Sequence, residues 1–302
     1  MILRKDIIMN KLIKYLSLPL VALLLASCSS TNESNAPVAK PSQSSSAENH
    51  EDTHTHPRGD GLVSTAQGVS LELKNSDLKV GDNKLEFTLK RMNELIDTYT
   101  IVHEKPIHMV IVDKTLGSFQ HLHPTMGKDF IWSVDVNFTN SGQYKVYTDF
   151  TLEEGGTDVN YVLSADANVA GSNDLNFVLP EPAESVIVDG YNVTVSGSVS
   201  AENHTMLMFT VLDSTGKPVT FDNYLGSTGH LIAIRDGDMA MAHMHNSDHT
   251  SHATSGHSST TSMPGMLHFD AEFPSGAGKY RLFLEFVVGG KKILATFTSN
   301  VI

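Results

Sequence analysis

Three histidines in the second half of the chain have the spacing expected for one face of a β-hairpin. His230 precedes Asp236-Gly237, and His243 and His245 follow it. Asp-Gly is favoured in two-residue type I′ turns, and such a turn would place His230 directly opposite His243. Because side chains alternate along a strand, His245 would project on the same face as His243. The sequence therefore predicts three imidazoles at the open end of one hairpin, which we call the second triplet.

A first triplet with the same spacing stands earlier in the chain, at His108, His121 and His123. Its expected turn, Lys114-Thr115, lacks the Asp-Gly signal. An even-numbered loop there keeps the triplet on one face, whereas an odd-numbered loop would split it. In both hairpins the histidine face is otherwise apolar, so it is predicted to look into the core of a sandwich, with the histidines at its rim. These apolar residues are Val110, Val112, Phe119, Ile232, Ile234, Met239 and Met241.

Imidazole rings that converge from neighbouring strands can bind a transition-metal ion. Neutral histidine coordinates zinc at about 2.0–2.1 Å and also suits copper and nickel. The thioether of methionine is a soft ligand that prefers Cu(I), and several methionines lie close to the second triplet in the sequence. Copper, as Cu(I) or Cu(II), is therefore favoured over zinc. Auxiliary ligands would come from Met241, Met244, His249, His252, His257, Met263, Met266 and His268.

A low-complexity segment, residues 246–265, follows the second triplet and is rich in histidine. It has no side chains suited to a core, and His-rich tracts of this kind favour metal collection. A disordered surface insertion without function is the alternative for this loop. For the triplets, the alternative is a hydrogen-bonded cap on the end of a sandwich. His103 has no partner at ligand spacing and is expected to be solvated.

An internal repeat indicates the architecture. After Val69 the chain consists of short alternating segments separated by Gly, Asn and Asp, which is typical of an all-β sandwich. Leu85-Glu-Phe-Thr corresponds to Leu207-Met-Phe-Thr, and the same ungapped register carries the first triplet onto the second. We therefore predict two tandem Ig-like or cupredoxin-like β-sandwich modules, residues 65–180 and 185–302.

Residues 1–27 are predicted to be an export signal, because a positive segment precedes an apolar stretch too short to span a membrane comfortably. The segment ends Leu25-Ala-Ser-Cys28, which resembles the lipobox of bacterial lipoproteins. This resemblance implies cleavage before Cys28 and lipid attachment to its thiol. An ordinary cleaved signal or an uncleaved anchor is the alternative. Residues 28–64 are polar and are expected to form a flexible tether.

Composition bounds the compartment and the partners. The formal net charge of -13 argues against nucleic acid as a partner. The single cysteine excludes an intramolecular disulfide, so the fold must be held by its hydrophobic cores. Together with the lipobox, these features predict a membrane-tethered protein of the cell envelope, periplasmic or on the cell surface.

The second triplet lies in the segment Leu225-Gly-Ser-Thr-Gly-His-Leu231, followed by His243-Met-His245. This pattern resembles that of secreted bacterial proteins with YtkA-like β-sandwich domains, in which a Leu-Gly-x-x-Gly-His-Leu segment precedes a His-x-His-Pro ending. The first module keeps the proline, Pro124, whereas the second has Asn246 in its place. The resemblance implies a β-sandwich fold and a role in copper handling.

The leading hypothesis is an extracytoplasmic lipoprotein that sequesters copper, or delivers it to a copper-transport protein or another envelope protein. A structural or adhesive envelope lipoprotein with Ig-like domains is the alternative. An enzyme is not expected. Three-histidine zinc sites can activate water, but no acid or base stands at a defined spacing from either triplet.

Overall fold

The computed structural model describes residues 58–75, 77–172, 176–197, 199–201, 205–246, 263–271, 273 and 276–302. The predicted signal, Cys28, most of the tether and the loop histidines His249, His252 and His257 lie outside the described residues. Among the described residues every regular element is a β-strand, and no helix is present that could cross a membrane. The all-β class predicted from the sequence is confirmed.

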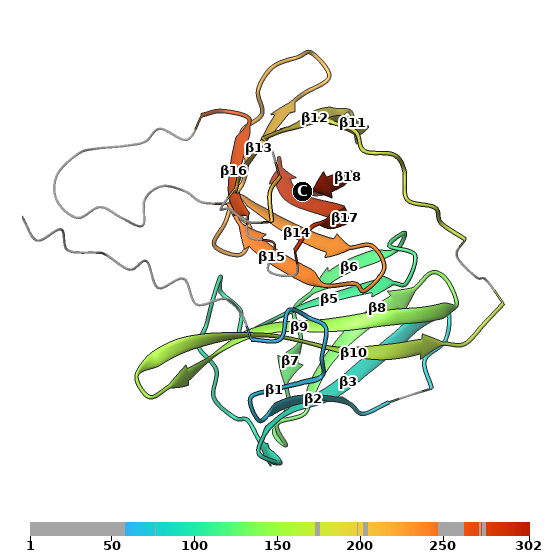
Figure 1. Cartoon of the computed structure of the whole chain (residues 1–302), viewed down its shortest axis with the longest axis vertical. Helices are drawn as coiled ribbons and strands as arrows, with labels where there is room; N and C mark the ends of the chain where they lie inside the picture. Colours follow the sequence, from blue (N-terminus) through green and yellow to red (C-terminus); the bar gives the residue numbers. More distant parts are fainter. Residues whose placement is uncertain are drawn as a thin grey trace, which may run out of the picture. The chain divides into compact units, whose positions relative to one another are not determined.

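The first module, β1 to β10, is a sandwich of two antiparallel sheets (Figure 1). One sheet has the order β1-β2-β3-β8-β7, with β4 beside β3, and the other has the order β10-β9-β5-β6. The strands are β1 (Thr65–Ala66), β2 (Val69–Leu73), β3 (Gly81–Arg91), β4 (Glu94–Leu95), β5 (Ile107–Asp113), β6 (Phe119–Leu122), β7 (Thr125–Met126), β8 (Trp132–Phe138), β9 (Gly142–Glu154) and β10 (Thr157–Val169).

The second module, β11 to β18, repeats this arrangement. Its sheets have the orders β11-β12-β13-β16 and β15-β14-β17-β18, which correspond to β1-β2-β3-β8 and β6-β5-β9-β10. The strands are β11 (Ser185–Val188), β12 (Tyr191–Ser196), β13 (Thr205–Leu212), β14 (Gly229–Arg235), β15 (Met241–His245), β16 (Met266–Ala271), β17 (Gly278–Val288) and β18 (Lys291–Val301).

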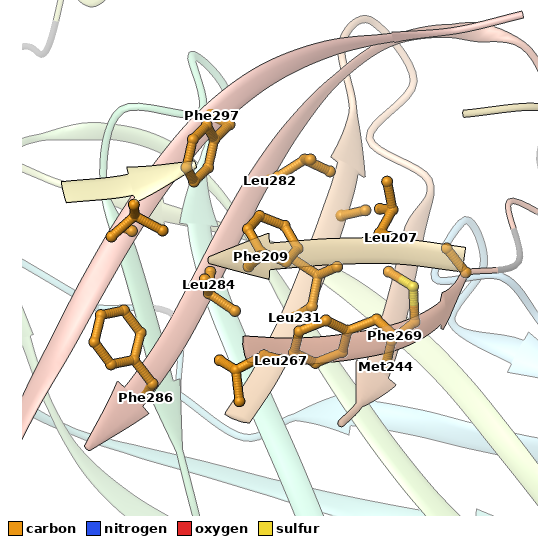
Figure 2. Close-up of a cluster of buried hydrophobic side chains, with 14 of the residues drawn as sticks. Leu207, Phe209, Leu231, Met244, Leu267, Phe269, Leu282, Leu284, Phe286 and Phe297 are labelled. Carbon is orange, nitrogen blue, oxygen red and sulfur yellow. The ribbon is translucent and has the colours of Figure 1, made fainter. Parts of the chain in front are cut away.

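Each sandwich encloses its own hydrophobic core. In the second module, Leu231 of β14 and Met244 of β15 pack in one cluster with Phe209 of the facing sheet (Figure 2). In the first module, Met109 of β5 packs with Phe87 of β3 in the same way. Burial of an apolar side chain of this size stabilises the fold by about 1.5–3 kcal/mol. These cores hold the strands that carry the histidines.

A third apolar cluster joins the two modules, and it overturns one prediction. Val110 and Val112 of β5 pack in it with Ile232 and Ile234 of β14. The histidine face of each hairpin therefore looks between the modules rather than into its own sandwich, so the predicted inward column at a sandwich rim is wrong. Both faces of β5 and β14 are buried. A strand buried on both faces reads as a continuous apolar run, and the sequence cannot tell its two faces apart.

Aromatic and polar contacts add to this junction. The ring of Phe119 in the first module stacks on that of Phe283 in the second, with centroids 4.2 Å apart. The Tyr147 hydroxyl donates a hydrogen bond to the backbone carbonyl of Met239, with an O···O distance of 2.7 Å. The two outer sheet faces are thus packed against each other as tightly as a core, which fixes the position of one triplet relative to the other.

The register of both hairpins differs from the prediction. His230 pairs with His245, and His243 lies opposite Ile232 instead of opposite His230. In the first module His121 lies opposite Val110, not opposite His108. The difference is two residues on the second strand in each case. A shift of two keeps every side chain on its own face, so both triplets survive the error.

The loops explain the difference. The Arg235 backbone N–H donates to the Ala240 carbonyl at 2.9 Å, so the hairpin closes through the loop 236–239 and not through a two-residue turn at Asp236-Gly237. The Asp238 carboxylate accepts two hydrogen bonds from the Arg235 guanidinium, at 2.9 and 2.5 Å. In the first module the Asp113 carboxylate accepts backbone N–H groups of the loop 114–117 in a comparable role. These side-chain contacts outweigh the local preference of Asp-Gly.

Candidate metal centre

The packing of the two modules brings both triplets into one histidine cluster. The ring of His243 lies 5.3 Å from that of His108 and 5.2 Å from that of His121, measured between centroids. The ring of His245 lies 5.9 Å from that of His108. The sequence predicted two separate sites, one in each hairpin. The structure instead brings the two triplets, three histidines from each module, into one contiguous cluster.

Two overlapping groups of ring nitrogens are close enough to hold a metal ion. His108, His121 and His243 form one group, and His230, His243 and His245 form the other; in each, the ligand atoms lie within 4.8 Å of one another. The first group draws on both modules. The second is the predicted second triplet. His243 belongs to both groups, so its single bare nitrogen can serve only one ion position at a time.

Backbone carbonyls fix the tautomer of the first histidine in each triplet. Nε2 of His108 lies 3.2 Å from the Val102 carbonyl oxygen, and Nε2 of His230 lies 3.0 Å from that of Tyr224. A carbonyl only accepts hydrogen bonds, so each Nε2 carries the proton and each Nδ1 is bare. Both carbonyls belong to tight turns with positive φ at the two central residues, 47° and 65° at His103-Glu104 and 54° and 70° at Leu225-Gly226.

Carboxylates from the opposite module fix the second histidine in each triplet. His121 Nδ1 donates to Glu285 at 2.7 Å, and His243 Nδ1 donates to Asp149 at 2.8 Å. Asp149 and Glu285 occupy equivalent positions of β9 and β17 in the repeat, so each module supplies the carboxylate for the other's histidine. A second hydrogen bond of this kind orients a metal-binding imidazole and raises its basicity. The ligand atom left in each ring is Nε2.

The bare nitrogens face one another. Nδ1 of His108 lies 3.3 Å from Nε2 of His121. With the tautomers above, both atoms present lone pairs, so they cannot hydrogen-bond to each other. Two nitrogens that bind one ion at about 2.0–2.1 Å in tetrahedral geometry lie about 3.3 Å apart. The separation is therefore that of two ligands of one ion.

Four further ring nitrogens of the cluster are buried without a hydrogen-bond partner. They are His123 Nε2, His230 Nδ1, His243 Nε2 and His245 Nε2. A buried polar atom without a partner costs about 1–3 kcal/mol. An ion held by His230, His243 and His245 would satisfy three of these atoms, and one held by His108, His121 and His243 would satisfy one of them. A hydrogen-bonded cap on the end of a sandwich would leave none of them unpaired.

Burial favours the neutral form of four histidines of the cluster. It lowers the pKa of His230 to about 4 and that of His123 to about 3, and it holds the pKa of both His243 and His245 well below the usual value. Burial also raises the pKa of Glu285, but its hydrogen bonds with His121 and Lys292 and the charge of Lys292 outweigh this and bring it to about 2. Neutral imidazole is the metal-binding form, so these four rings are ready to bind at neutral pH.

The predicted auxiliary ligands lie elsewhere or outside the described residues. Met244 packs in the second core on the opposite face of β15 (Figure 2). Met241 packs in the apolar cluster between the modules. Met266 and His268 belong to β16, in the other sheet of the second module, and Met263 is 62% exposed. His249, His252 and His257 are not described. Among the described residues, the donor set around the bare nitrogens is thus imidazole.

A family model described as a domain of unknown function (DUF8832) matches two stretches of the chain, residues 63–167 and 185–302. The chain belongs to this family. Each stretch contains one histidine triplet and one of the two carboxylates, Asp149 or Glu285. No curated protein sequence matches the chain.

Solved structures resemble the chain only loosely. A Salmonella α2-macroglobulin reacted with methylamine has 12% identity and a TM-score of 0.24, over 82% of this chain and 16% of that one. A DUF4785 family protein from Legionella pneumophila has 12% identity and a TM-score of 0.26, over 77% of this chain and 56% of that one. The chain thus spans a small part of the first protein and about half of the second. Such similarity says nothing of function.

Sequence reasoning missed the partners that orient the DUF8832 histidines. Asp149 and Glu285 are acidic residues at equivalent positions of the repeat, directly before Phe150 and Phe286, and this was the available signal. His103, expected to be solvated, stacks on His245 with ring centroids 3.6 Å apart. Its contact could not be predicted, because it depends on how the two modules pack.

Proposed function

We propose that the chain is a lipid-anchored, extracytoplasmic protein that binds one transition-metal ion, copper by preference, in the histidine cluster between its two modules. The observation that carries this proposal is the convergence of bare, buried imidazole nitrogens from both modules. The role would be sequestration of the ion or its delivery to another envelope protein, without catalysis. The lipobox at Cys28 supports the anchor and the compartment.

The preference for copper no longer rests on methionine ligands; it rests on the imidazole donors of the cluster. Among divalent ions, a site of nitrogen ligands binds Cu²⁺ more tightly than Ni²⁺ or Zn²⁺, in the Irving–Williams order. The imidazole donors of the cluster therefore favour Cu²⁺ when the ions compete. Geometry can still shift this order, so the test compares ions directly.

Metal titration of the purified mature chain tests the proposal. We expect one tightly bound Cu²⁺ per chain, retained after deletion of residues 246–262 and lost in the double variant His121→Ala/His243→Ala. Competition with Zn²⁺ and Ni²⁺ should leave Cu²⁺ bound. Copper binding that disappears with the loop but survives the double variant would contradict the site. A protein that binds none of these ions would support the structural or adhesive alternative.

The anchor is tested separately. Membrane-extracted protein should carry the added mass of lipid, and the variant Cys28→Ala should be released in soluble form or remain unprocessed. Unchanged membrane attachment and mass in Cys28→Ala would overturn the lipoprotein assignment without affecting the metal site.

A further inference from the structure

A cavity adjoins the histidine cluster on one side. Its volume is about 260 Å³, and its lining includes His108 and His243, two of the three members of the group that draws on both modules. His245, whose Nε2 is buried without a partner, also lines it. The remaining wall includes Lys105 and Asn160. The cavity therefore lies next to the place where the bare nitrogens gather.

The repeat shows why there is space on this side. Asn160 of β10 donates from Nδ2 to Asp149 at 2.7 Å. At the equivalent position of β18, Lys292 donates from Nζ to Glu285 at 2.8 Å and lies over the ring of Tyr224, 5.8 Å from its centroid. The short amide of Asn160 leaves space beside its carboxylate, whereas the long side chain of Lys292 covers the other one.

Exposure of the two carboxylates agrees with this difference. The Asp149 side chain is 13% exposed, and that of Glu285 only 3%. The charge of Asp149 is directed to the His243 N–H, and Lys105 contributes a cation to the cavity wall. With an ion in the cluster, the cavity would thus contain two positive centres and one engaged carboxylate. Such an environment attracts a small anion.

The geometry points to an open coordination position: an ion held by His108, His121 and His243 faces this cavity and binds a small anion there as a further ligand. This inference rests on the proposed metal binding and adds to it the class of exogenous ligand. Three protein ligands leave a four-coordinate ion one position for an outside molecule. The cavity gives that molecule room and a path from solvent, so the bound ion can exchange ligands without separation of the modules.

Azide binding to the Cu²⁺-loaded mature chain tests this inference. We expect a saturable azide-to-copper charge-transfer absorption band, with copper still bound. The variant Asn160→Lys copies the second module and should weaken azide binding about tenfold or more. The control variant Lys291→Asn, at an exposed position beside Lys292, should bind azide as well as the parent chain does. Equal azide affinity in all three proteins would overturn the inference.

A second variant, at the cavity wall, tests the inference independently in case Asn160→Lys does not fold. Lys105→Glu reverses the charge at the cavity wall and should weaken azide binding about fivefold, through screened Coulomb interactions. The control Lys79→Glu, at an exposed position of the first module, should not change it. Copper binding without any azide band overturns only the open position. Absence of copper binding overturns the proposed function and this inference with it.

Discussion

The two modules orient their equivalent histidines in the same way, but they differ in how the carboxylate beside those histidines is covered. In both, a turn carbonyl and a carboxylate of the other module fix the first two histidines of the triplet. At the edge, Asn160 leaves a cavity beside Asp149, whereas Lys292 covers Glu285. The contacts that orient the ligand nitrogens are thus present in both modules, whereas the cavity beside the histidine cluster lies on the Asp149 side.

Removal of His243 should have the largest effect on metal binding, because this histidine belongs to both candidate groups. We expect His243→Ala to weaken Cu²⁺ affinity by more than about a hundredfold, beyond the usual effect of a lost orienting partner. His123→Ala removes a residue of neither group and should weaken it much less. Calorimetric titration of both variants measures the contrast. Equal losses of Cu²⁺ affinity in the two variants would mean that the two candidate groups of ligand nitrogens are not the metal site.

Loss of an orienting carboxylate should be the next largest effect. Glu285→Gln and Asp149→Asn should each weaken Cu²⁺ affinity about ten- to a hundredfold. Glu285→Gln should be the more damaging, because the Glu285 side chain is less exposed than that of Asp149, 3% against 13%, and its charge also pairs with Lys292. Both affinities can be measured by competition with a chelator. A larger loss of Cu²⁺ affinity in Asp149→Asn than in Glu285→Gln would contradict this expectation.

Acid should destabilise the metal-free protein in a defined window. Histidines with a folded-state pKa below the unfolded value of about 6.5 bind fewer protons when folded, so their contribution is fully present above that pH. As pH falls from about 6.5 to about 4, the pKa of His230, the free energy of unfolding should drop by about 1.4 kcal/mol per pH unit for each such histidine. Urea titrations at several pH values measure this slope. A constant stability across the window would contradict the buried, neutral state of the cluster.

Substitutions at the junction between the modules should lower the free energy of unfolding more than substitutions on an exposed surface do. Phe119→Ala removes the stack on Phe283 and should lower the free energy of unfolding by about 2 kcal/mol, less than for a fully buried ring because Phe119 is half-buried. Phe130→Ala, at a position 38% exposed, serves as the control and should change it by less than about 0.5 kcal/mol. Equal effects in chemical denaturation would argue against a packed junction.

The smallest effect is expected from Met244→Leu. This side chain lies in the second core, and Leu fills a similar volume, so stability should fall by less than about 1.5 kcal/mol. Copper affinity, measured by the same chelator competition, should remain within about twofold of the parent value. A strong loss of Cu(I) affinity would restore methionine as a ligand and favour the chemistry predicted from the sequence.

The sequence predicted the all-β fold because alternation and the internal repeat are local signals. It also predicted which histidines share a face, since an error of two residues in register leaves the face unchanged. It could not predict that Ile232 and Val110 pack between the modules, because strands buried on both sides carry no alternation. The contact between the two triplets, and the pairing of His121 with Glu285, depend on that packing. Because the packing could not be predicted from the sequence, neither could these contacts.

The exchange of carboxylates between the modules has a consequence for assembly. A contact in which one copy's histidine meets the other's carboxylate, and the reverse, is the pattern of an isologous dimer with two-fold symmetry. Here both copies lie in one chain, so their association does not depend on protein concentration. A single module presents only half of the centre. A protein built from one such module would have to pair with a second copy to complete it.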